Sequence, residues 1–312
     1  MPWTDADIPD QTGKTFLITG ANSGLGYLSA LILAGKNALV VIASRNKSKA
    51  RRACDLILEE YPQAQVETMQ LDLANRGSIY EFAAAFRRNH SRLDVLVNNA
   101  GVMATPYRLT DDGFEMQLGT NHLGHFALTG LLLDLILAAP DSRVVTVASM
   151  TEMIGRIRFS DLQRRNSYER WTAYGQSKLA NLLFAFELQR LFTTHGAQAI
   201  SLAAHPGFAE SNLRKTQLPG NTSAFQRLLL NVFEWMSQDG FIGVLPQLYA
   251  ATALQACGGC YYGPDGFLQI HGYPKQVRPS RRARDIQLAR RLWQVSEELT
   301  GVRYSWTGSK KS

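Results

Sequence analysis

The hydrophobic pattern of the chain alternates between short continuous runs and longer stretches with helical spacing. The continuous runs, rich in Val, Ile, Leu and Ala, predict buried strands near residues 14–19, 38–44, 65–71, 93–98, 143–148, 198–204 and 266–270. Between them, apolar residues recur every three or four positions, as in the stretch 112–137, which predicts helices. Strands that alternate with helices predict an α/β fold with a doubly wound, mainly parallel, seven-stranded sheet.

Composition adds bounds on organisation and compartment. The 312 residues contain no linker or repeat, and 45% of them are apolar, so we expect one domain spanning 1–312. Three cysteines are too few for a disulfide scaffold and indicate a reducing compartment. Two of them form Cys257-Gly-Gly-Cys260, which has no second Cys or His pair nearby. We interpret this motif as structural, and not as a zinc site or a redox pair.

The net charge of +7 raises the question of nucleic acid binding. Much of the excess lies within the C-terminal helix and tail, about 275–312, where basic residues interleave with a helical apolar pattern and predict a solvated helix face. No nucleic-acid motif is present, so we expect no nucleic acid partner. The amphipathic, aromatic-rich segment Phe225 to Trp235 is compatible with weak contact to a membrane surface.

A glycine-rich turn follows the first predicted strand. In Gly20-Ala-Asn-Ser-Gly24-Leu-Gly26, three glycines let the backbone turn sharply and bring N–H groups toward a diphosphate at a helix N-terminus. The spacing is not that of the usual G-x-G-x-x-G fingerprint, and a tight strand–helix connection is the simpler alternative. The residues expected to contact a dinucleotide here are Gly20, Asn22, Ser23, Gly24, Leu25 and Gly26.

The end of the second predicted strand bears on the choice of dinucleotide. An NAD-preferring site usually offers a carboxylate there to the ribose hydroxyls, whereas this chain has Ser44-Arg45 and no carboxylate until Asp55. Arg45 can pair with a 2′-phosphate, and Ser44 adds a hydroxyl donor. The sequence therefore favours NADP(H) over NAD(H); alternatively, Arg45 is a surface residue that caps the next helix.

Tyr174 and Lys178 lie four positions apart, which places both side chains on one face of a helix. A neighbouring ammonium favours phenolate, so we expect the pKa of Tyr174 to be lowered toward neutral pH, which suits proton transfer to or from an oxygen atom. Because Tyr-x-x-x-Lys also occurs on ordinary helices, other motifs decide the interpretation.

Four further signals stand at the ends of predicted strands or on bordering helices. They are Asn98-Asn-Ala-Gly101, Asn121, Ser149 (25 residues before Tyr174) and His205-Pro-Gly207. A serine after a strand is more often a helix cap, and His122 and His125 beside Asn121 have no evident third metal ligand, so we interpret both histidines as structural and expect no metal.

Together with the glycine turn, this ordered set resembles the short-chain dehydrogenase/reductase family over nearly the whole chain, from about residue 12 to 301. The segments around Asn121, Tyr174 and His205 are similar to retinol-dehydrogenase-like members and their bacterial relatives. The first 13 residues are polar and no run approaches the ~18 apolar residues of a spanning helix. We therefore expect a soluble, cytoplasmic protein.

The resemblance implies a Rossmann domain and a role for each motif. Tyr174 is expected to be the general acid and base, Lys178 to lower its pKa and bind the nicotinamide ribose, Ser149 to orient the substrate oxygen, and Asn121 to hold a water for proton relay. Asp72 is expected to read the adenine amino group. The other residues implied at the cofactor are Leu73, Asn98, Ala100, Gly101, Pro206, Gly207 and Ser211, the last replacing the family's usual threonine.

The resemblance also implies a helical substrate lid at about 208–240. The residues expected to line the substrate pocket are Met103, Met150, Thr151, Met153, Phe208, Phe225 and Trp235. Their apolar character favours a hydrophobic carbonyl or alcohol substrate, although some could instead pack the core beneath the lid. The chain is expected to be a monomer or a homo-oligomer.

Two alternatives to a hydride-transferring oxidoreductase remain open. A non-catalytic dinucleotide sensor or scaffold would not need Tyr174 and Lys178 together. An enzyme of the same fold that uses the nicotinamide for epimerisation or dehydration usually has an altered set of catalytic residues, and no such alteration is visible here.

Overall fold

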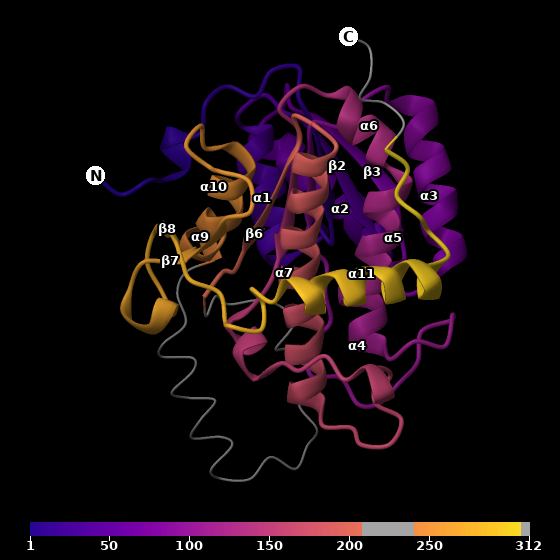
Figure 1. Cartoon of the computed structure of the whole chain (residues 1–312). Helices are drawn as coiled ribbons and strands as arrows, with labels where there is room; N and C mark the ends of the chain where they lie inside the picture. The colour runs from indigo at the N-terminus through magenta and orange to yellow at the C-terminus, as the bar shows by residue number, and fades with distance from the viewer. Residues whose placement is uncertain (208–239, 307–312) are drawn as a thin grey trace, which may run out of the picture.

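The computed structural model describes residues 1–207 and 240–306, which form an α/β domain around one eight-stranded sheet (Figure 1). The strand order is β3-β2-β1-β4-β5-β6-β7-β8, and every pair is parallel except β7 and β8. The strands are β1 (Thr15–Thr19), β2 (Leu39–Ser44), β3 (Gln65–Gln70), β4 (Val95–Asn98), β5 (Arg143–Val147), β6 (Ile200–Ala204), β7 (Tyr261–Pro264) and β8 (Pro274–Gln276). The predicted single, doubly wound domain is confirmed.

Helices cover both faces of the sheet, as expected for parallel strands joined by helical crossovers. They are α1 (Gly24–Ala34), α2 (Lys47–Glu60), α3 (Arg76–Asn89), α4 (Met116–Leu118), α5 (Gly124–Leu131), α6 (Leu133–Ala138), α7 (Arg170–Thr194), α9 (Gly240–Gly243), α10 (Leu245–Thr252) and α11 (Ile286–Thr300). Figure 1 shows α11 crossing the outer side of α7. None of the helices in the described part of the chain is long and apolar enough to cross a membrane.

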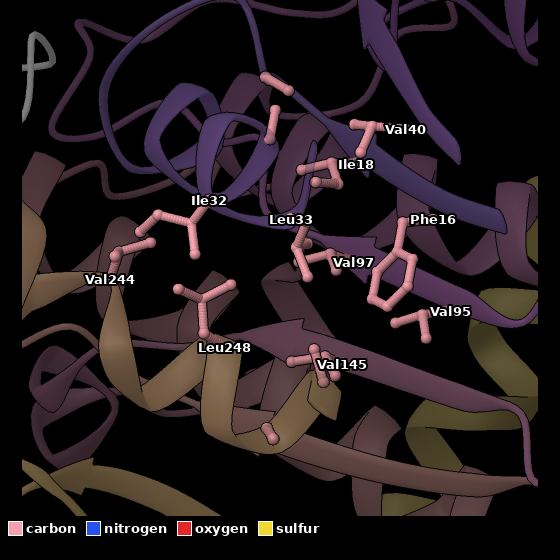
Figure 2. Close-up of a cluster of buried hydrophobic side chains, with 14 of the residues drawn as sticks. Phe16, Ile18, Ile32, Leu33, Val40, Val95, Val97, Val145, Val244 and Leu248 are labelled. Carbon is pink, nitrogen blue, oxygen red and sulfur yellow. The ribbon is translucent and has the colours of Figure 1, made fainter. Parts of the chain in front are cut away.

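The core divides between the two faces because successive strand residues point in opposite directions. On one face, Phe16 and Ile18 of β1 join Leu33 of α1 and Leu248 of α10 (Figure 2). Leu17, between them, belongs to the cluster on the other face, with residues of α3 and α5. The inner strands, such as β1 and β4, are buried on both sides, which is why their sequences are continuous apolar runs. The edge strand β3 has no buried residue and a mixed sequence.

The prediction for the last strand is wrong in position and in count. The parallel strand next to β6 is β7, where all four residues are buried, and β8 adds an eighth, antiparallel strand. The predicted segment 266–270 contains instead the 3₁₀ turn η5 (Phe267–Gln269), in which Leu268 has a left-handed φ of 51°. Phe267 and Leu268 are 77% and 64% exposed, so this apolar run does not enter the core.

The two cysteines of the Cys257-Gly-Gly-Cys260 motif form a disulfide, and Cys54 is free. The pair closes the loop that leads into β7, at the amino end of the strand. Its structural role stays a prediction. The disulfide itself was not expected. Its presence removes the support that cysteine usage gave to a reducing compartment.

Candidate active site

The carboxyl ends of the parallel strands meet at one edge of the sheet, and the predicted motifs gather there. Gly20 follows β1, Asn98 ends β4, Ser149 follows β5 and His205 follows β6. In doubly wound folds this edge is where ligands bind, because the chain connections leave a crevice there.

Tyr174 and Lys178 lie in the first half of α7, whose N-terminus is capped by the Glu169 carboxylate. Both side chains are buried, at 8% and 4% exposure. The Lys178 ammonium is 5.7 Å from the centre of the Tyr174 ring and donates to the Val147 carbonyl at 3.0 Å. The Val147 carbonyl, at the end of β5, also accepts from the Asn181 side-chain amide. The end of β5 therefore holds the lysine in place.

Of the two roles considered for Ser149, the helix cap is confirmed, and the contact with the substrate oxygen stays a prediction. It is the N-cap of the 3₁₀ helix η3 (Met150–Ile154), where its hydroxyl oxygen accepts from the Thr151 amide at 3.3 Å. The same hydroxyl hydrogen-bonds the Tyr174 phenol. The cap therefore fixes the serine next to the tyrosine.

Burial shifts the pKa values of the pair in directions that the sequence did not indicate. Burial raises the pKa of Tyr174 to about 12, with the Ser149 hydrogen bond acting in the opposite sense. Burial also lowers the pKa of Lys178 to about 8. The prediction of a lowered tyrosine pKa is therefore wrong for the chain alone, because loss of solvent outweighs the attraction of a cation at this separation.

Asn121 lies in a π-helical segment, η2 (Gly119–Leu123), where the predicted helix 112–137 is irregular. Its side-chain oxygen accepts from Val102 N at 2.8 Å, and its amide donates to Val102 O and Ser177 Oγ, both at 2.9 Å. A Cβ on Gly101 would lie 3.2 Å from the Asn121 oxygen and 3.6 Å from Lys178 Nζ. The asparagine thus braces the 101–102 backbone beside the lysine; its water-holding role stays a prediction.

The glycine turn has the geometry that its composition predicts. Gly20 and Gly24 have left-handed φ values of 69° and 57°, and a Cβ on Gly26 would collide with the Asn99 amide. Ser23 is the N-cap of α1 but makes no side-chain capping hydrogen bond. Space is open where a Cβ of Gly24 would project. The turn therefore presents the N-terminus of an eleven-residue helix to an open space, which fits a phosphate group.

Asn99, next to the predicted Asn98, holds the glycine turn. The Asn98 side chain is fully buried and donates to Thr129 of α5, so it links β4 to a helix. The Asn99 amide donates to Thr19 O at 2.7 Å, and Asn99 N and Ala100 N both donate to the Thr19 hydroxyl. Neither Asn99 nor Thr19 is among the residues predicted from the sequence to hold the dinucleotide; the doubled asparagine at 98–99 was the available signal.

The predicted 2′-phosphate site lies at the end of β2. The Ser44 hydroxyl donates to the Asn22 side chain at 2.9 Å, so it braces the glycine turn. The Arg45 side chain is 73% exposed, and its Nε lies 3.9 Å from the Asp72 carboxylate. Asn46, not Arg45, caps α2, so the capping alternative for Arg45 is wrong.

Leu73, also predicted at the cofactor, packs its side chain in the core. A Cβ on Gly124 would collide with the Leu73 carbonyl.

Some of the residues predicted to line the substrate pocket lie in the described part of the chain. Met103, Met150 and Thr151 are half-buried, and Met153 is 59% exposed. Gly207 has a φ of 65° and packs against Ile270. The remaining predictions, Phe208, Ser211, Phe225, Trp235 and the lid 208–240 apart from Gly240, lie outside the described residues.

The basic C-terminal segment contacts η3, an arrangement that the sequence did not predict. The buried Glu152 carboxylate accepts from Ser280 N and Oγ at 2.9 and 2.6 Å. Arg282, interpreted as part of a solvated face, donates to the carbonyls of Met153 and Gly155. No pattern of spacing links positions so far apart in the chain.

Comparisons with known proteins agree with this geometry. The family profile described as short chain dehydrogenase matches residues 14–221. Human retinol dehydrogenase 13 is 40% identical over 95% of this chain and 86% of its own length, and human retinol dehydrogenase 12 is 39% identical over 96% and 90%. A crystal structure of an uncharacterized protein from Mycobacterium paratuberculosis is 42% identical, covers 98% of this chain and 100% of its own, and has a TM-score of 0.81.

Proposed function

Because the chain belongs to the short chain dehydrogenase family, we propose that it is an NADP(H)-dependent oxidoreductase acting on a carbonyl or alcohol group of a hydrophobic small molecule. Its relatives support a dehydrogenase or reductase role in general terms. The observation that carries the more specific proposal is the buried Tyr174–Ser149 hydrogen bond beside Lys178, at the same sheet edge as the glycine turn.

The residues fit a nicotinamide dinucleotide. The open space at Gly24 and the uncapped N-terminus of α1 would receive the diphosphate, and Arg45 would reach the 2′-phosphate. An ammonium has three donors, and the Val147 carbonyl takes one at Lys178, so others are available for the ribose hydroxyls. When bound, the nicotinamide supplies or accepts the hydride.

The chain's own residues manage the proton. With a pKa of about 12, Tyr174 stays protonated at neutral pH and is ready to donate to a carbonyl oxygen as that oxygen becomes an alcohol. Ser149 donates to the same oxygen and stabilises the charge that develops there. The Lys178 ammonium stabilises the phenolate that remains on Tyr174.

The rate of carbonyl reduction is expected to fall above about pH 8. The Lys178 ammonium dominates below its folded-state pKa of about 8 and is lost as the pH rises through that value, whereas Tyr174 remains protonated. One titration of this kind lowers kcat roughly tenfold between pH 7 and pH 9. The measurement is kcat against pH at saturating NADPH; a flat profile to pH 10 would show that Lys178 charge is not required.

The hydrophobic substrate is supported by the half-buried Met103 and Met150 near the site and by relatives named for retinol, a long apolar alcohol. We expect long-chain and aromatic aldehydes to exceed sugar aldehydes in kcat/KM by roughly tenfold or more, since two buried methylenes are worth about 1.6 kcal/mol. The test is a panel of aldehydes and ketones followed by NADPH absorbance. A panel in which sugars react best would overturn the substrate class, and no turnover of any member would overturn the activity.

A further inference from the structure

His125 of α5 is a buried titratable group with no part in the proton transfer described above. It is 1% exposed and comes from the helix that follows the π-helical segment η2. Its two ring nitrogens face the two halves of the site. Nδ1 lies 2.9 Å from the backbone oxygen of Asn121, and Nε2 lies 2.9 Å from the Thr19 hydroxyl.

The partners determine where the protons lie. A carbonyl oxygen only accepts, so Nδ1 must carry the hydrogen in its contact with Asn121. Burial lowers the pKa of His125 to about 4, so the ring is neutral and Nε2 is an acceptor. The Thr19 hydroxyl therefore donates to Nε2 at 2.9 Å, in preference to the Val97 carbonyl at 3.3 Å.

The Thr19 hydroxyl connects this ring to the glycine turn. Its oxygen accepts from Asn99 N and Ala100 N, both at 2.9 Å, and its own backbone carbonyl accepts from the Asn99 amide. A directed series of hydrogen bonds thus runs from the Asn99–Ala100 backbone through Thr19 to His125, and from His125 to Asn121. Every side chain in the series is fully or almost fully buried except Asn99.

Asn121 depends on this contact because of its place in the helix. In η2 the Gly124 amide bonds to Gly119 O, five residues back, which shifts the hydrogen-bond register of the following turn. The His125 ring supplies a donor to Asn121 O, while the Asn121 side chain holds Val102 and Ser177. Ser177 in turn donates to the Tyr174 carbonyl. The backbone position of Asn121 therefore sets how the 101–102 segment and α7 meet beside Lys178.

We propose that His125 is a positioning residue that, in its neutral Nδ1–H form, couples the glycine turn on the dinucleotide side to Asn121 on the proton-transfer side. The inference rests on the proposed function for its kinetic consequence but not for its hydrogen-bond arrangement. Removing the Nδ1 contact loosens Asn121 and lowers kcat. Removing the Nε2 contact loosens Thr19 and the Asn99–Ala100 backbone, and raises KM for the dinucleotide.

Two amide variants separate the two contacts. His125→Asn keeps a donor near the Nδ1 position, and His125→Gln keeps a polar group near the Nε2 position. Both remove the imidazole ring, so a purely structural loss lowers Tm in both. We expect His125→Gln to lower kcat about tenfold with KM for NADPH little changed, and His125→Asn to retain kcat while KM rises about tenfold, the scale of one buried hydrogen bond.

The matched control is His122→Gln. His122 is also buried, but its Nε2 lies 2.9 Å from Ser296 of α11 and not from Thr19. This variant is expected to lower Tm and leave kcat and KM within about twofold of the parent chain, within the usual error of such a comparison. Equal kinetic effects of the Asn and Gln variants of His125, or the same effects from His122→Gln, overturn the proposal.

A readout without turnover keeps the inference separate from the proposed function. In ¹⁵N-histidine-labelled protein, the His125 resonances, identified by their loss in His125→Gln, are expected to show a protonated Nδ1 and an unprotonated Nε2 from pH 6 to 8. An Nε2–H form or a charged ring overturns the coupling. If the parent chain reduces no carbonyl, the proposed function fails. The observed His125 tautomer still tests the series of hydrogen bonds through Thr19, His125 and Asn121.

Discussion

Tyr174→Phe is expected to lower kcat about a hundred- to ten-thousand-fold, the range that positioned proton transfer contributes to enzyme rates. The change removes one hydroxyl and leaves a ring of the same shape in a site where the tyrosine is 8% exposed. Ser149 loses its partner but keeps its cap on η3. Lys178 keeps the Val147 carbonyl. The variant is therefore expected to fold and to bind NADPH as tightly as the parent chain.

The measurement is kcat with the best aldehyde from the panel, together with the Kd of NADPH from its fluorescence and the Tm. Tyr261→Phe is the matched control, because Tyr261 is also buried and its hydroxyl has no hydrogen-bond partner in the described structure. That control is expected to keep kcat, since its hydroxyl has no role in the proposed chemistry. Turnover by Tyr174→Phe within tenfold of the parent would remove Tyr174 from the proposed role.

The sheet was predictable because parallel strands are buried on both faces and leave continuous apolar runs. Val40-Val-Ile-Ala43 and Val144-Val-Thr-Val147 are runs of this kind, and both are strands. The same rule failed at 266–270, where Phe267 and Leu268 are apolar but exposed. Local composition identifies apolar residues, but the tertiary structure decides which of them are covered.

The positions of the site residues were predictable from the sequence, whereas their pKa values were not. Tyr174, Lys178 and Ser149 follow from helix spacing and strand ends, which are local properties. The direction of the pKa shift at Tyr174 depends on burial, which spacing does not encode, and the sequence estimate considered only the lysine's charge. The contact of His125 with Thr19 joins residues 106 apart, and no spacing pattern marks the π-helical register at Asn121, so only the folded chain reveals them.

Arg45→Asp is expected to weaken NADPH binding by about 10- to 150-fold and to change NADH binding much less. A hydrogen bond to a charged group is worth about 1.5–3 kcal/mol, which corresponds to that range. Arg45 sits at the carboxyl end of β2 beside the Ser44–Asn22 contact of the glycine turn. Its pairing with Asp72 at 3.9 Å is exposed and therefore weak, so turning toward a 2′-phosphate costs little. An aspartate there would repel the phosphate but could accept from ribose hydroxyls.

The measurement is the ratio of the Kd values for NADPH and NADH, because the ratio cancels any general loss of folded protein. Arg52→Asp is the matched control: it makes the same charge change on the exposed surface of α2, away from the strand end. If bulk electrostatics alone attracted the phosphate, both variants would change the ratio equally, and salt would reduce both effects. A ratio altered only by Arg45→Asp supports the 2′-phosphate contact, whereas equal weakening of both dinucleotides by that variant removes the basis for NADP(H).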